Sequence, residues 1–309
     1  EHIEEHLVQS GYSSLNSTTY DKEFCLVPSK LIEFIRESQP KRYKQLESQY
    51  GSETSTKLLK RISTEIENRG VIDVLRKGVK DRGCDFHLVY FEPKSGLNPD
   101  HQKLYKQNRL SVVRQLKYST QNENSLDMGI FVNGIPIITM ELKNTLTGQN
   151  HLNGEKQYKY DRDPKEPLFH FKRCLVHFSV GNEKVSMTTK LSGSKTKFLP
   201  FNKGIENPVN PNGHKTHYLW ESILQPKNVL DLIENFVHTR FDVEKLYDPK
   251  QKRVVDKKKE VLVFPRFHQL NVIHKLKQSV IEEGVGHNYL IQHTTGSGKS
   301  LSIGWLSHL

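Results

Sequence analysis

The predicted fold is centred on one segment, Leu126-Asp-Met-Gly-Ile-Phe-Val-Asn-Gly-Ile-Pro-Ile-Ile-Thr-Met-Glu-Leu-Lys143. Its two short apolar runs flank Asn133-Gly134, a dipeptide that strongly favours a tight turn between antiparallel strands. Three charged residues, Asp127, Glu141 and Lys143, lie at the open end of this predicted hairpin. Because burying an unpaired carboxylate is costly, carboxylates this close to a predicted core indicate a metal or a cation nearby.

The register of the hairpin decides whether the two carboxylates meet. Side chains of a strand alternate between the two faces of the sheet, so Glu141 and Lys143 share a face. A regular two-residue turn would place Asp127 opposite Met140, pointing away from Glu141. A three-residue loop or a bulge shifts the register by one residue and puts Asp127 and Glu141 on one face. A shared metal site therefore requires the shifted register.

The composition is that of a globular protein whose partner carries negative charge. The chain has 309 residues, of which 35% are hydrophobic and 26% charged, and its formal net charge is +11. No apolar run approaches the roughly 20 residues of a membrane-spanning helix, and the net charge favours nucleic acid as a partner. Cys25, Cys84 and Cys174 are odd in number and widely spaced, which argues against a disulfide framework or a zinc ribbon and fits a reducing cytoplasm.

Helices are predicted at the start of the chain and strands in its middle. Apolar residues at helical spacing predict helices over 1–9, 28–39, 41–50, 55–70, 71–77, 151–162 and 228–238. Strand patterns lie over 24–27, 84–91, 109–118, 174–180 and 185–191. Helices before and between strands indicate an α/β sheet domain. We therefore divide the chain into an α/β domain over 1–240, a charged linker over 241–260 and a new unit over 261–309.

Cleavage of a phosphodiester bond is the chemistry that would employ Asp127, Glu141 and Lys143 together. Two converging carboxylates suit Mg²⁺, a hard cation that neutralises developing charge and activates water. The backbone carbonyl of Leu142 would be a further metal ligand. Lys143 would orient the attacking water and stabilise the transition state. The alternative is that these are surface charges at strand ends, joined by an incidental salt bridge.

A nucleotide-binding loop is predicted near the end of the chain. His293-Thr-Thr-Gly-Ser-Gly-Lys-Ser300 follows a predicted buried strand over 288–292 and precedes a predicted helix over 301–309, which is the strand–loop–helix context of a P-loop. His293 replaces the first glycine of the consensus. The backbone around the glycines would enclose phosphates, the lysine would reach the β- and γ-phosphates, and the last serine would hold Mg²⁺. A glutamine 30 residues upstream resembles the adenine-reading Q-motif of superfamily 2 helicases and translocases. The residues expected to bind nucleotide are Gln269, Gly296, Ser297, Gly298, Lys299 and Ser300.

The order of these motifs resembles the motor/nuclease (R) subunit of type I restriction enzymes, HsdR. The resemblance rests on the hairpin of Asp127 and Glu141-x-Lys143, then Gln157-Tyr-Lys-Tyr-Asp-Arg-Asp-Pro-Lys-Glu-Pro167, Phe198-Leu-Pro-Phe201, Phe264-Pro-Arg-Phe-His-Gln269 and the P-loop. It implies a PD-(D/E)xK restriction-endonuclease-like domain, with a mixed central sheet flanked by helices, followed by the truncated start of a RecA-like P-loop motor domain. It also implies Gln157 as a catalytic residue, carried on a helix after the hairpin.

The resemblance further implies Mg²⁺ and ATP as cofactors and double-stranded DNA as substrate. It implies a cytoplasmic complex with methyltransferase (M) and specificity (S) subunits. Because the sequence stops ten residues after Lys299, without a Walker B acid, we expect its ATP site to be incomplete.

Two other functions would use similar parts. One is a nuclease-helicase of DNA recombination or repair, and the other is a non-catalytic DNA-binding scaffold; intact Asp127, Glu141 and Lys143 argue against the scaffold. A third pattern, His2-Ile-Glu-Glu-His6, fits inverted zinc proteases. Two histidines one turn apart on a charged helix are more often ordinary surface residues, so we assign no zinc site there.

Overall fold

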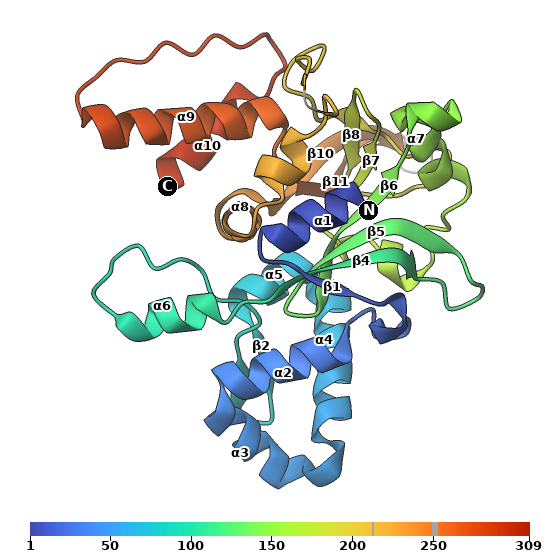
Figure 1. Ribbon diagram of the computed structural model, residues 1–309, viewed down its shortest axis with the longest axis vertical. Coiled ribbons are helices and arrows are strands. Elements are labelled where there is room, and N and C mark those ends of the chain that lie inside the picture. Colours follow the sequence, from blue (N-terminus) through green and yellow to red (C-terminus); the bar gives the residue numbers. More distant parts are fainter. Residues whose placement is uncertain (212, 249–252) are drawn as a thin grey trace.

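A mixed β-sheet forms the centre of the molecule (Figure 1). The computed structural model describes residues 1–211, 213–248 and 253–309. Within these ranges the sheet has seven strands in the order β1-β4-β5-β6-β7-β8-β9. Neighbouring strands are antiparallel except for the parallel pairs β1–β4 and β6–β7. The strands are β1 Ser13–Leu15, β4 Leu110–Lys117, β5 Ser125–Val132, β6 Ile135–Leu142, β7 Val176–Val180, β8 Val185–Thr188 and β9 Leu199–Pro200.

The predicted helices at the start of the chain all form, and the four over residues 28–77 pack as a group at one end of the sheet, whereas the first lies beside it (Figure 1). Apolar stripes explain their packing: in α4, the stripe Leu58, Leu59, Ile62 and Ile66 is buried. Gly70 separates α4 from α5 with a positive φ of 88°, a backbone conformation that favours glycine. The helices are α1 His2–Gln9, α2 Pro28–Ser38, α3 Pro40–Tyr50, α4 Thr54–Arg69 and α5 Val71–Lys77.

Later helices flank the sheet or follow it. They are α6 Pro99–Lys106, α7 His151–Tyr160, α8 Pro226–Asp231, α9 Phe267–Glu283 and α10 Lys299–His308. The helix predicted over 228–238 is split between α8 and a π-helical turn over Leu232–Phe236. The mixed central sheet flanked by helices is therefore confirmed. None of the helices in the described ranges is long and apolar enough to cross a bilayer.

Two hydrophobic clusters fill the faces of the sheet. The larger contains the inward residues of α2, α4 and α5 together with Met128, Met140 and Phe178. The smaller lies under α7 and contains Tyr158 and Phe169. The buried isoleucines and the methionine of β6 all belong to the larger cluster, whereas β5 contributes to both, with Leu126 and Phe131 in the smaller one.

Several predicted strands are shorter than expected or absent. Residues 84–91 contain only the three-residue strand β3 Cys84–Phe86, which pairs with β2 Val79–Asp81 in a small separate sheet. Residues 24–27, predicted as a strand, form a turn closed by a bridge between Asp21 and Leu26. Cys25 has a positive φ of 52° there, which is incompatible with extended backbone.

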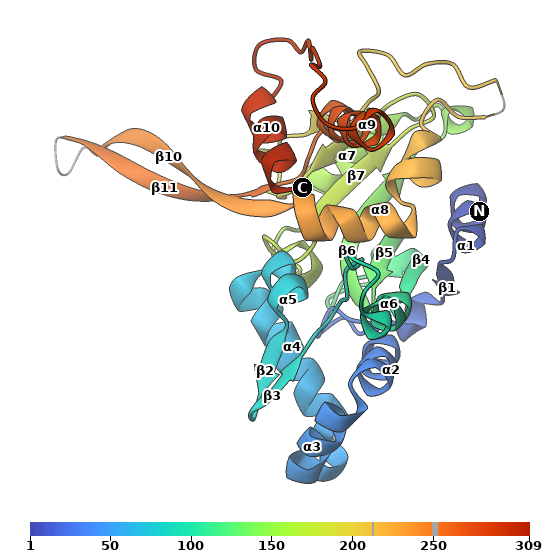
Figure 2. The same ribbon diagram turned by 90° about the vertical axis from the view of Figure 1, so that its left-hand side faces the viewer.

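The charged segment over 241–260 differs most from expectation. Instead of a linker, it belongs to two long antiparallel strands, β10 His238–Asp248 and β11 Arg253–Val263. Figure 2 shows this hairpin projecting from the body of the molecule. Its charges alternate in sign across the strands, with Asp242 opposite Lys259 and Glu244 opposite Lys257, and such pairs stabilise a ribbon. Residues 249–252, part of the predicted linker, lie outside the described ranges.

The unit after residue 261 packs against the sheet, but its predicted strand does not form. Phe264 contacts the rings of Phe178 and Phe201, and Trp305 of α10 donates a hydrogen bond to the carbonyl of Phe236. Residues 288–292, predicted as a buried strand, are extended and exposed. A strand needs a neighbour to satisfy its backbone groups, and no described segment pairs with these residues.

Candidate nuclease site

The Asn133-Gly134 turn joins β5 to β6 as a two-residue connection, because Val132 pairs directly with Ile135. Both turn residues have positive φ, 50° and 81°, as a tight hairpin turn with right-handed twist requires. Asn133 is fully buried, and its side-chain carbonyl accepts a hydrogen bond of 2.7 Å from the Arg109 N–H. The turn therefore has the regular form that, by itself, would separate the carboxylates.

A bulge in β6 corrects the register. Phe131 pairs with Pro136, whereas Ile130 pairs with Ile138, so Ile137 is an extra residue on the β6 side. A proline has no N–H to give to a ladder and is tolerated in strands mainly at edges and bulges. The Ile137 carbonyl instead accepts a hydrogen bond from Leu175. The ladder is thus broken in the way a shared site requires.

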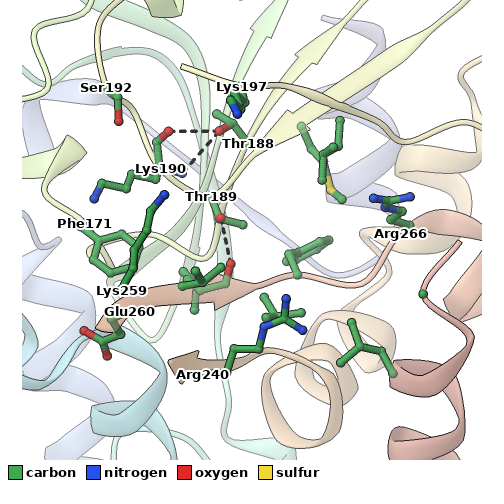
Figure 3. A pocket seen from close by; sticks show the side chains of 18 of the residues that line it. Phe171, Thr188, Thr189, Lys190, Ser192, Lys197, Arg240, Lys259, Glu260 and Arg266 are labelled. Carbon is green, nitrogen blue, oxygen red and sulfur yellow. Dashed lines mark hydrogen bonds between the residues drawn. The ribbon is translucent and has the colours of Figure 1, made fainter. Parts of the chain in front are cut away.

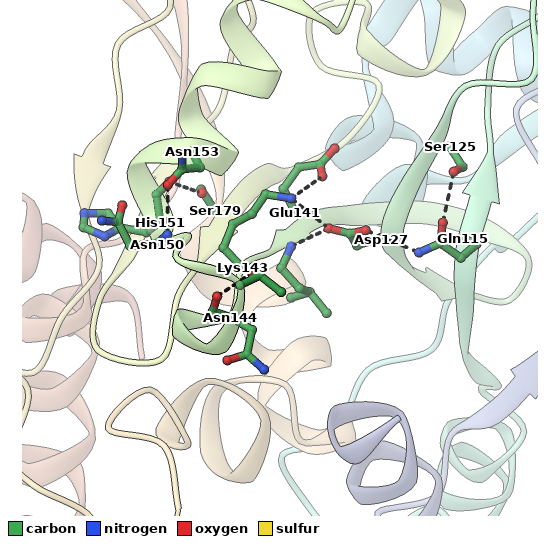
Figure 4. Close-up of polar contacts among 12 residues, drawn as sticks. Gln115, Ser125, Asp127, Glu141, Lys143, Asn144, Asn150, His151, Asn153 and Ser179 are labelled. Atoms are coloured by element: carbon green, nitrogen blue, oxygen red, sulfur yellow. Dashed lines mark hydrogen bonds and ion pairs between the residues drawn. The ribbon is translucent and has the colours of Figure 1, made fainter.

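Beyond the bulge, Met128 pairs with Met140, and continuing this register by one residue places Asp127 opposite Glu141. Lys143 lies between the two carboxylates (Figure 4): its Nζ is 3.4 Å from Oδ2 of Asp127 and 3.6 Å from Oε2 of Glu141. The Glu141 side chain is 1% exposed and that of Lys143 7%. The structure therefore brings together Asp127, Glu141 and Lys143, the three charged residues that the sequence singled out.

Leu142 contributes through its backbone. Its N–H donates a hydrogen bond of 2.8 Å to Oδ2 of Asp127. The N–H and C=O of one strand residue point toward the same neighbouring strand, so the Leu142 carbonyl also faces β5. This is the side on which a metal held by Asp127 would lie.

Burial and a second cation, Arg162, have opposite effects on the pKa of Glu141. Nε and Nη2 of Arg162 lie 2.9 Å and 2.7 Å from its Oε1. Burial raises the pKa of Glu141 to about 7, although the Arg162 guanidinium opposes this and nearby Asp127 adds to it. The group thus exchanges its proton near neutral pH, where a cation binding at Oε2 would favour the ionised form.

Helix α7 is held unusually close to β6 by a glycine. A Cβ at Gly154 would lie 2.2 Å from Oγ of Ser179 and 3.2 Å from Cβ of Glu141. One turn later, the buried Tyr158 hydroxyl lies 2.8 Å from Oγ1 of Thr139, which in turn lies 2.7 Å from Nδ1 of His177. Burial lowers the pKa of His177 to about 3, so the ring is neutral. Packing and a buried polar chain fix this helix to the strand that carries Glu141.

Gln157, predicted as a catalytic residue, lies on α7 one turn after Gly154, on the face turned toward β6. Its Oε1 is buried and has no hydrogen-bond partner among the described residues. Tyr160 is 65% exposed, and Tyr158 is committed to Thr139. An unsatisfied buried carbonyl oxygen calls for an explanation, such as an ion or a water.

The donors in this site fit a hard divalent cation. Mg²⁺ prefers carboxylate and carbonyl oxygens together with water. Asp127 and Glu141 provide two carboxylates on one face, both within 4 Å of Nζ of Lys143. The described residues contain no cluster of three or more histidine, cysteine, aspartate or glutamate side chains that could hold a metal. An ion here would therefore depend on backbone oxygen and water for its remaining ligands.

Comparison with known proteins assigns the part of the chain that contains this site to a family. Residues 1–196 match the family described as "Type I restriction enzyme R protein N terminus". The chain belongs to this family. Similar proteins include the putative type I restriction enzyme MjaVIIIP endonuclease subunit of Methanocaldococcus jannaschii, which is 24% identical over 99% of this chain and 28% of its own length. Another is the type I restriction enzyme HindI endonuclease subunit of Haemophilus influenzae, 25% identical over 63% of this chain and 18% of its own length.

The chain thus spans about a quarter or less of the curated R-protein relatives it matches. The matched residues include α1, the sheet strands β1 to β8 and α7, and so contain the whole carboxylate site. The P-loop lies beyond the match.

Two residues of the predicted P-loop, Ser297 and Gly298, contact the side chain of Gln269. Gly296 and Gly298 have positive φ, 77° and 86°, and a Cβ at Gly298 would lie 2.4 Å from Nε2 of Gln269. That Nε2 donates a hydrogen bond of 3.1 Å to the Gly298 carbonyl. Nζ of Lys299 donates to the carbonyls of His293 and Thr294. Ser297 is buried in the loop, and Ser300 follows Lys299 in the first turn of α10.

A cavity of about 640 Å³ adjoins this loop (Figure 3). It lies between the loop after β8, the base of the β10–β11 hairpin and the P-loop, and it includes Gln269 and Gly298. Several of its lining residues carry positive charge: Lys190, Lys195, Lys197, Arg240, Lys259 and Arg266. Its chemistry is suited to an anionic ligand.

Sequence reasoning missed two residues that contact the carboxylates. Arg162 was named only as part of the segment over 157–167, whereas the structure pairs it with Glu141. Gln115 was not considered; its Nε2 donates a hydrogen bond of 3.3 Å to Oδ1 of Asp127. The helix predicted over 151–162 would have put Tyr158 and Arg162 on one face, but α7 ends at Tyr160 and Arg162 lies beyond it. No sequence pattern pointed to Gln115.

Candidate residues near the amino terminus take other roles. Glu4, on the first helix, is paired with Arg114 and accepts a hydrogen bond from Ser14. His2 of the zinc-protease pattern packs against the rings of His214 and Trp220.

Proposed function

We propose that this chain carries the nuclease site of a type I restriction enzyme R subunit and the P-loop of its ATP-driven DNA translocase. The reaction is Mg²⁺-dependent endonucleolytic cleavage of double-stranded DNA. The family match and the names of the relatives support the restriction role, and they favour it over a recombination nuclease-helicase or a non-catalytic scaffold. The observation that carries the nuclease assignment is the bulge at Ile137, which puts Asp127 opposite Glu141.

Asp127, Glu141 and the Leu142 carbonyl would hold the metal. When bound, Mg²⁺ neutralises charge on the scissile phosphate and lowers the pKa of a water. Lys143, held between the two carboxylates, would orient the attacking water and donate a hydrogen bond to the developing negative charge on phosphorus-bound oxygen. Gln157 would direct its unsatisfied Oε1 toward this water. These roles need no movement of β5 or β6.

The P-loop would bind ATP. The N–H groups around Gly296, Ser297 and Gly298 would enclose phosphates at the start of α10, with Lys299 on the outer phosphates and Ser300 on Mg²⁺. Gln269 would face the adenine from the wall of the adjoining cavity. In the complete protein, ATP turnover would drive DNA movement and bring distant DNA to the nuclease.

The partners would be double-stranded DNA and the M and S subunits. A separate S subunit would explain why a nuclease site of this kind can serve without reading a sequence itself. The net charge of +11 supports a nucleic-acid partner.

The test uses the complete R subunit assembled with its M and S subunits, on a plasmid carrying the recognition sequence. Asp127→Asn should abolish cleavage and leave ATP hydrolysis unchanged, while Lys299→Ala should abolish ATP hydrolysis and, with it, cleavage. Asp85→Asn and Lys103→Ala, at exposed positions in β3 and α6, serve as matched controls.

Two results would contradict the proposal. Cleavage at the normal rate by Asp127→Asn would remove the nuclease assignment. Unchanged ATP turnover by Lys299→Ala would remove the motor assignment while leaving the nuclease assignment intact.

A further inference from the structure

In each carboxylate of the candidate nuclease site, one oxygen faces Lys143 and the other oxygen faces a different partner. Oδ2 of Asp127 and Oε2 of Glu141 face Lys143. The outer oxygens have different partners: Gln115 donates to Oδ1 of Asp127 and Arg162 to Oε1 of Glu141. Both partners lie outside the Asp127, Glu141-x-Lys143 pattern.

The two outer partners are joined to each other through Ser125. Its hydroxyl donates a hydrogen bond of 3.1 Å to Oε1 of Gln115, and its carbonyl accepts one of 3.0 Å from Nη2 of Arg162. The contacts therefore close into a ring that runs from Asp127 through Gln115, Ser125, Arg162, Glu141 and Lys143 back to Asp127. Figure 4 shows the half of it formed by Ser125, Gln115 and Asp127.

The backbone at Gln115 is shaped for this contact. The pairs Arg114–Met128 and Leu116–Leu126 flank it, so Gln115 lies opposite Asp127 in the β4–β5 ladder. Its φ is 46° in the middle of an eight-residue strand, a conformation that residues with a side chain rarely adopt. Strain of this kind persists where the surrounding structure requires it, and it concentrates at functional sites.

The guanidinium of Arg162 is also held by several hydrogen bonds. Its side chain is 10% exposed, and it makes three N–H contacts, two to Oε1 of Glu141 and one to Ser125. A planar guanidinium can make these contacts at once, whereas a lysine ammonium of the same charge cannot reproduce their geometry. The arrangement leaves Oε2 of Glu141 as the oxygen available to an ion.

We propose that Gln115 and Arg162 are positioning residues of the nuclease site, which hold the outer oxygens of Asp127 and Glu141 so that the inner oxygens converge on one divalent ion. Ser125 contacts both of them. This inference rests on the proposed function. Groups that orient metal-binding carboxylates typically contribute about 10- to 100-fold to metal affinity.

The test measures Mn²⁺ binding to the 309-residue chain by titration calorimetry, together with the melting temperature in the absence of metal. Gln115→Asn keeps an amide and tolerates a positive φ, but it is one methylene too short to reach Asp127. Arg162→Lys keeps the charge and loses the planar contacts. Each should weaken Mn²⁺ binding about 10-fold without lowering the metal-free melting temperature beyond the controls. The double variant should weaken it by the product of the two factors, because the residues hold different carboxylates.

The controls are Gln121→Asn, in the loop between β4 and β5, and Arg61→Lys, in an ion pair with Glu65 on α4. Both should bind Mn²⁺ like the unaltered chain. Should Arg162→Lys fail to fold, Arg162→Gln takes its place; it keeps an N–H donor but is too short and neutral to reproduce the contacts with Glu141.

The outcomes separate the two levels of the argument. If Asp127→Ala abolishes Mn²⁺ binding while Gln115→Asn and Arg162→Lys bind within twofold of the unaltered chain, the positioning role is wrong and the metal site stands. If Asp127→Ala binds Mn²⁺ normally, the metal site itself is wrong and the positioning role falls with it. If the variants lower the metal-free melting temperature as well as the Mn²⁺ affinity, Gln115 and Arg162 have a structural role instead.

Discussion

The backbone N–H of Leu142 donates a hydrogen bond of 2.8 Å to Oδ2 of Asp127. The β6 strand therefore binds the Asp127 carboxylate with its main chain as well as facing it with Glu141 and Lys143. Such a contact to an ionised carboxylate is stronger than a neutral hydrogen bond, and it fixes one oxygen at the edge of the strand. The site is organised by the pairing of two strands, and its features lead to four predictions.

Gly154→Ala should disturb the site although alanine usually stabilises a helix. The new Cβ would meet Oγ of Ser179 at 2.2 Å and Cβ of Glu141 at 3.2 Å, so α7 must move away from β6. We expect at least a tenfold loss of Mn²⁺ affinity, on the scale of a disturbed metal ligand. Adding Ser179→Ala, which removes the nearest obstructing atom, should restore part of it.

The matched control is Gly304→Ala in α10, where an added Cβ meets nothing within 4 Å. This change should raise the free energy of unfolding by up to about 1 kcal/mol. Normal Mn²⁺ binding by Gly154→Ala would contradict the close packing of α7.

Asn133→Ala should destabilise the hairpin. It removes the acceptor for the Arg109 N–H, which is partly buried, and the donor to the Leu88 carbonyl, which is buried, and it places alanine at a φ of 50°. Each unsatisfied buried group costs about 1–3 kcal/mol, and the left-handed backbone adds about 1 kcal/mol. Urea denaturation should show a loss of about 3 kcal/mol or more, against little change for the exposed Asn122→Ala. A loss no larger than that of Asn122→Ala would count against the buried role of the turn.

His177 should make the protein less stable in mild acid. Its folded pKa, about 3, lies below the ordinary value of 6.5, so between these pH values the unfolded chain binds a proton that the folded chain excludes. The free energy of unfolding then falls with decreasing pH, by at most about 1.4 kcal/mol per pH unit from this residue. The measurement is the stability difference between the unaltered chain and His177→Gln at pH 7, 6 and 5, because other groups cancel in this difference.

That difference should shrink as the pH falls. A difference independent of pH would show that His177 is not excluded from protonation in the folded protein.

Metal binding should release protons near neutral pH. The pKa of Glu141 is raised to about 7, chiefly by burial, so a fraction of the metal-free protein holds a proton there that an incoming ion must displace. Mn²⁺ affinity should therefore increase as the pH rises from 6 to 8 and level off above. Calorimetry at pH 6.5 in two buffers of different ionisation enthalpy should show proton release, with little at pH 8.5. Equal heats in both buffers at pH 6.5 would contradict it.

The local fold was predictable where a repeating pattern met a clear end signal. Helices α4 and α5 begin and end within a residue of their predicted bounds, because apolar stripes coincide with Gly70 and the glycine after Lys77. The β10–β11 hairpin was missed for the opposite reason. Its strands are charged on both faces, and only cross-strand pairing reveals that Glu244 and Lys257 lie side by side.

The sequence allowed us to predict which register the candidate site requires, but not how the strands achieve it. Residue spacing showed that Asp127 and Glu141 need a shifted register. Pro136 in the strand is a signal for a bulge that was not used. Sequence could not identify Ile137 as the extra residue. The contact of Gln115 with Asp127 was beyond reach, because it depends on the pairing of β4 with β5 across a separate loop.

Because of the bulge at Ile137, the site depends on the number of residues between Asp127 and Glu141. Deleting this one residue would leave every charged side chain of the pattern in the sequence, yet would reverse which side of the sheet each residue from Ile138 to Lys143 occupies. Glu141 would enter the larger hydrophobic cluster, and Met140 would take its place beside Asp127. A search for the catalytic spacing that tolerates gaps of one residue would accept such a chain, although its carboxylates could no longer meet. In this chain the number of residues between Asp127 and Glu141, odd or even, decides whether the two carboxylates share a face.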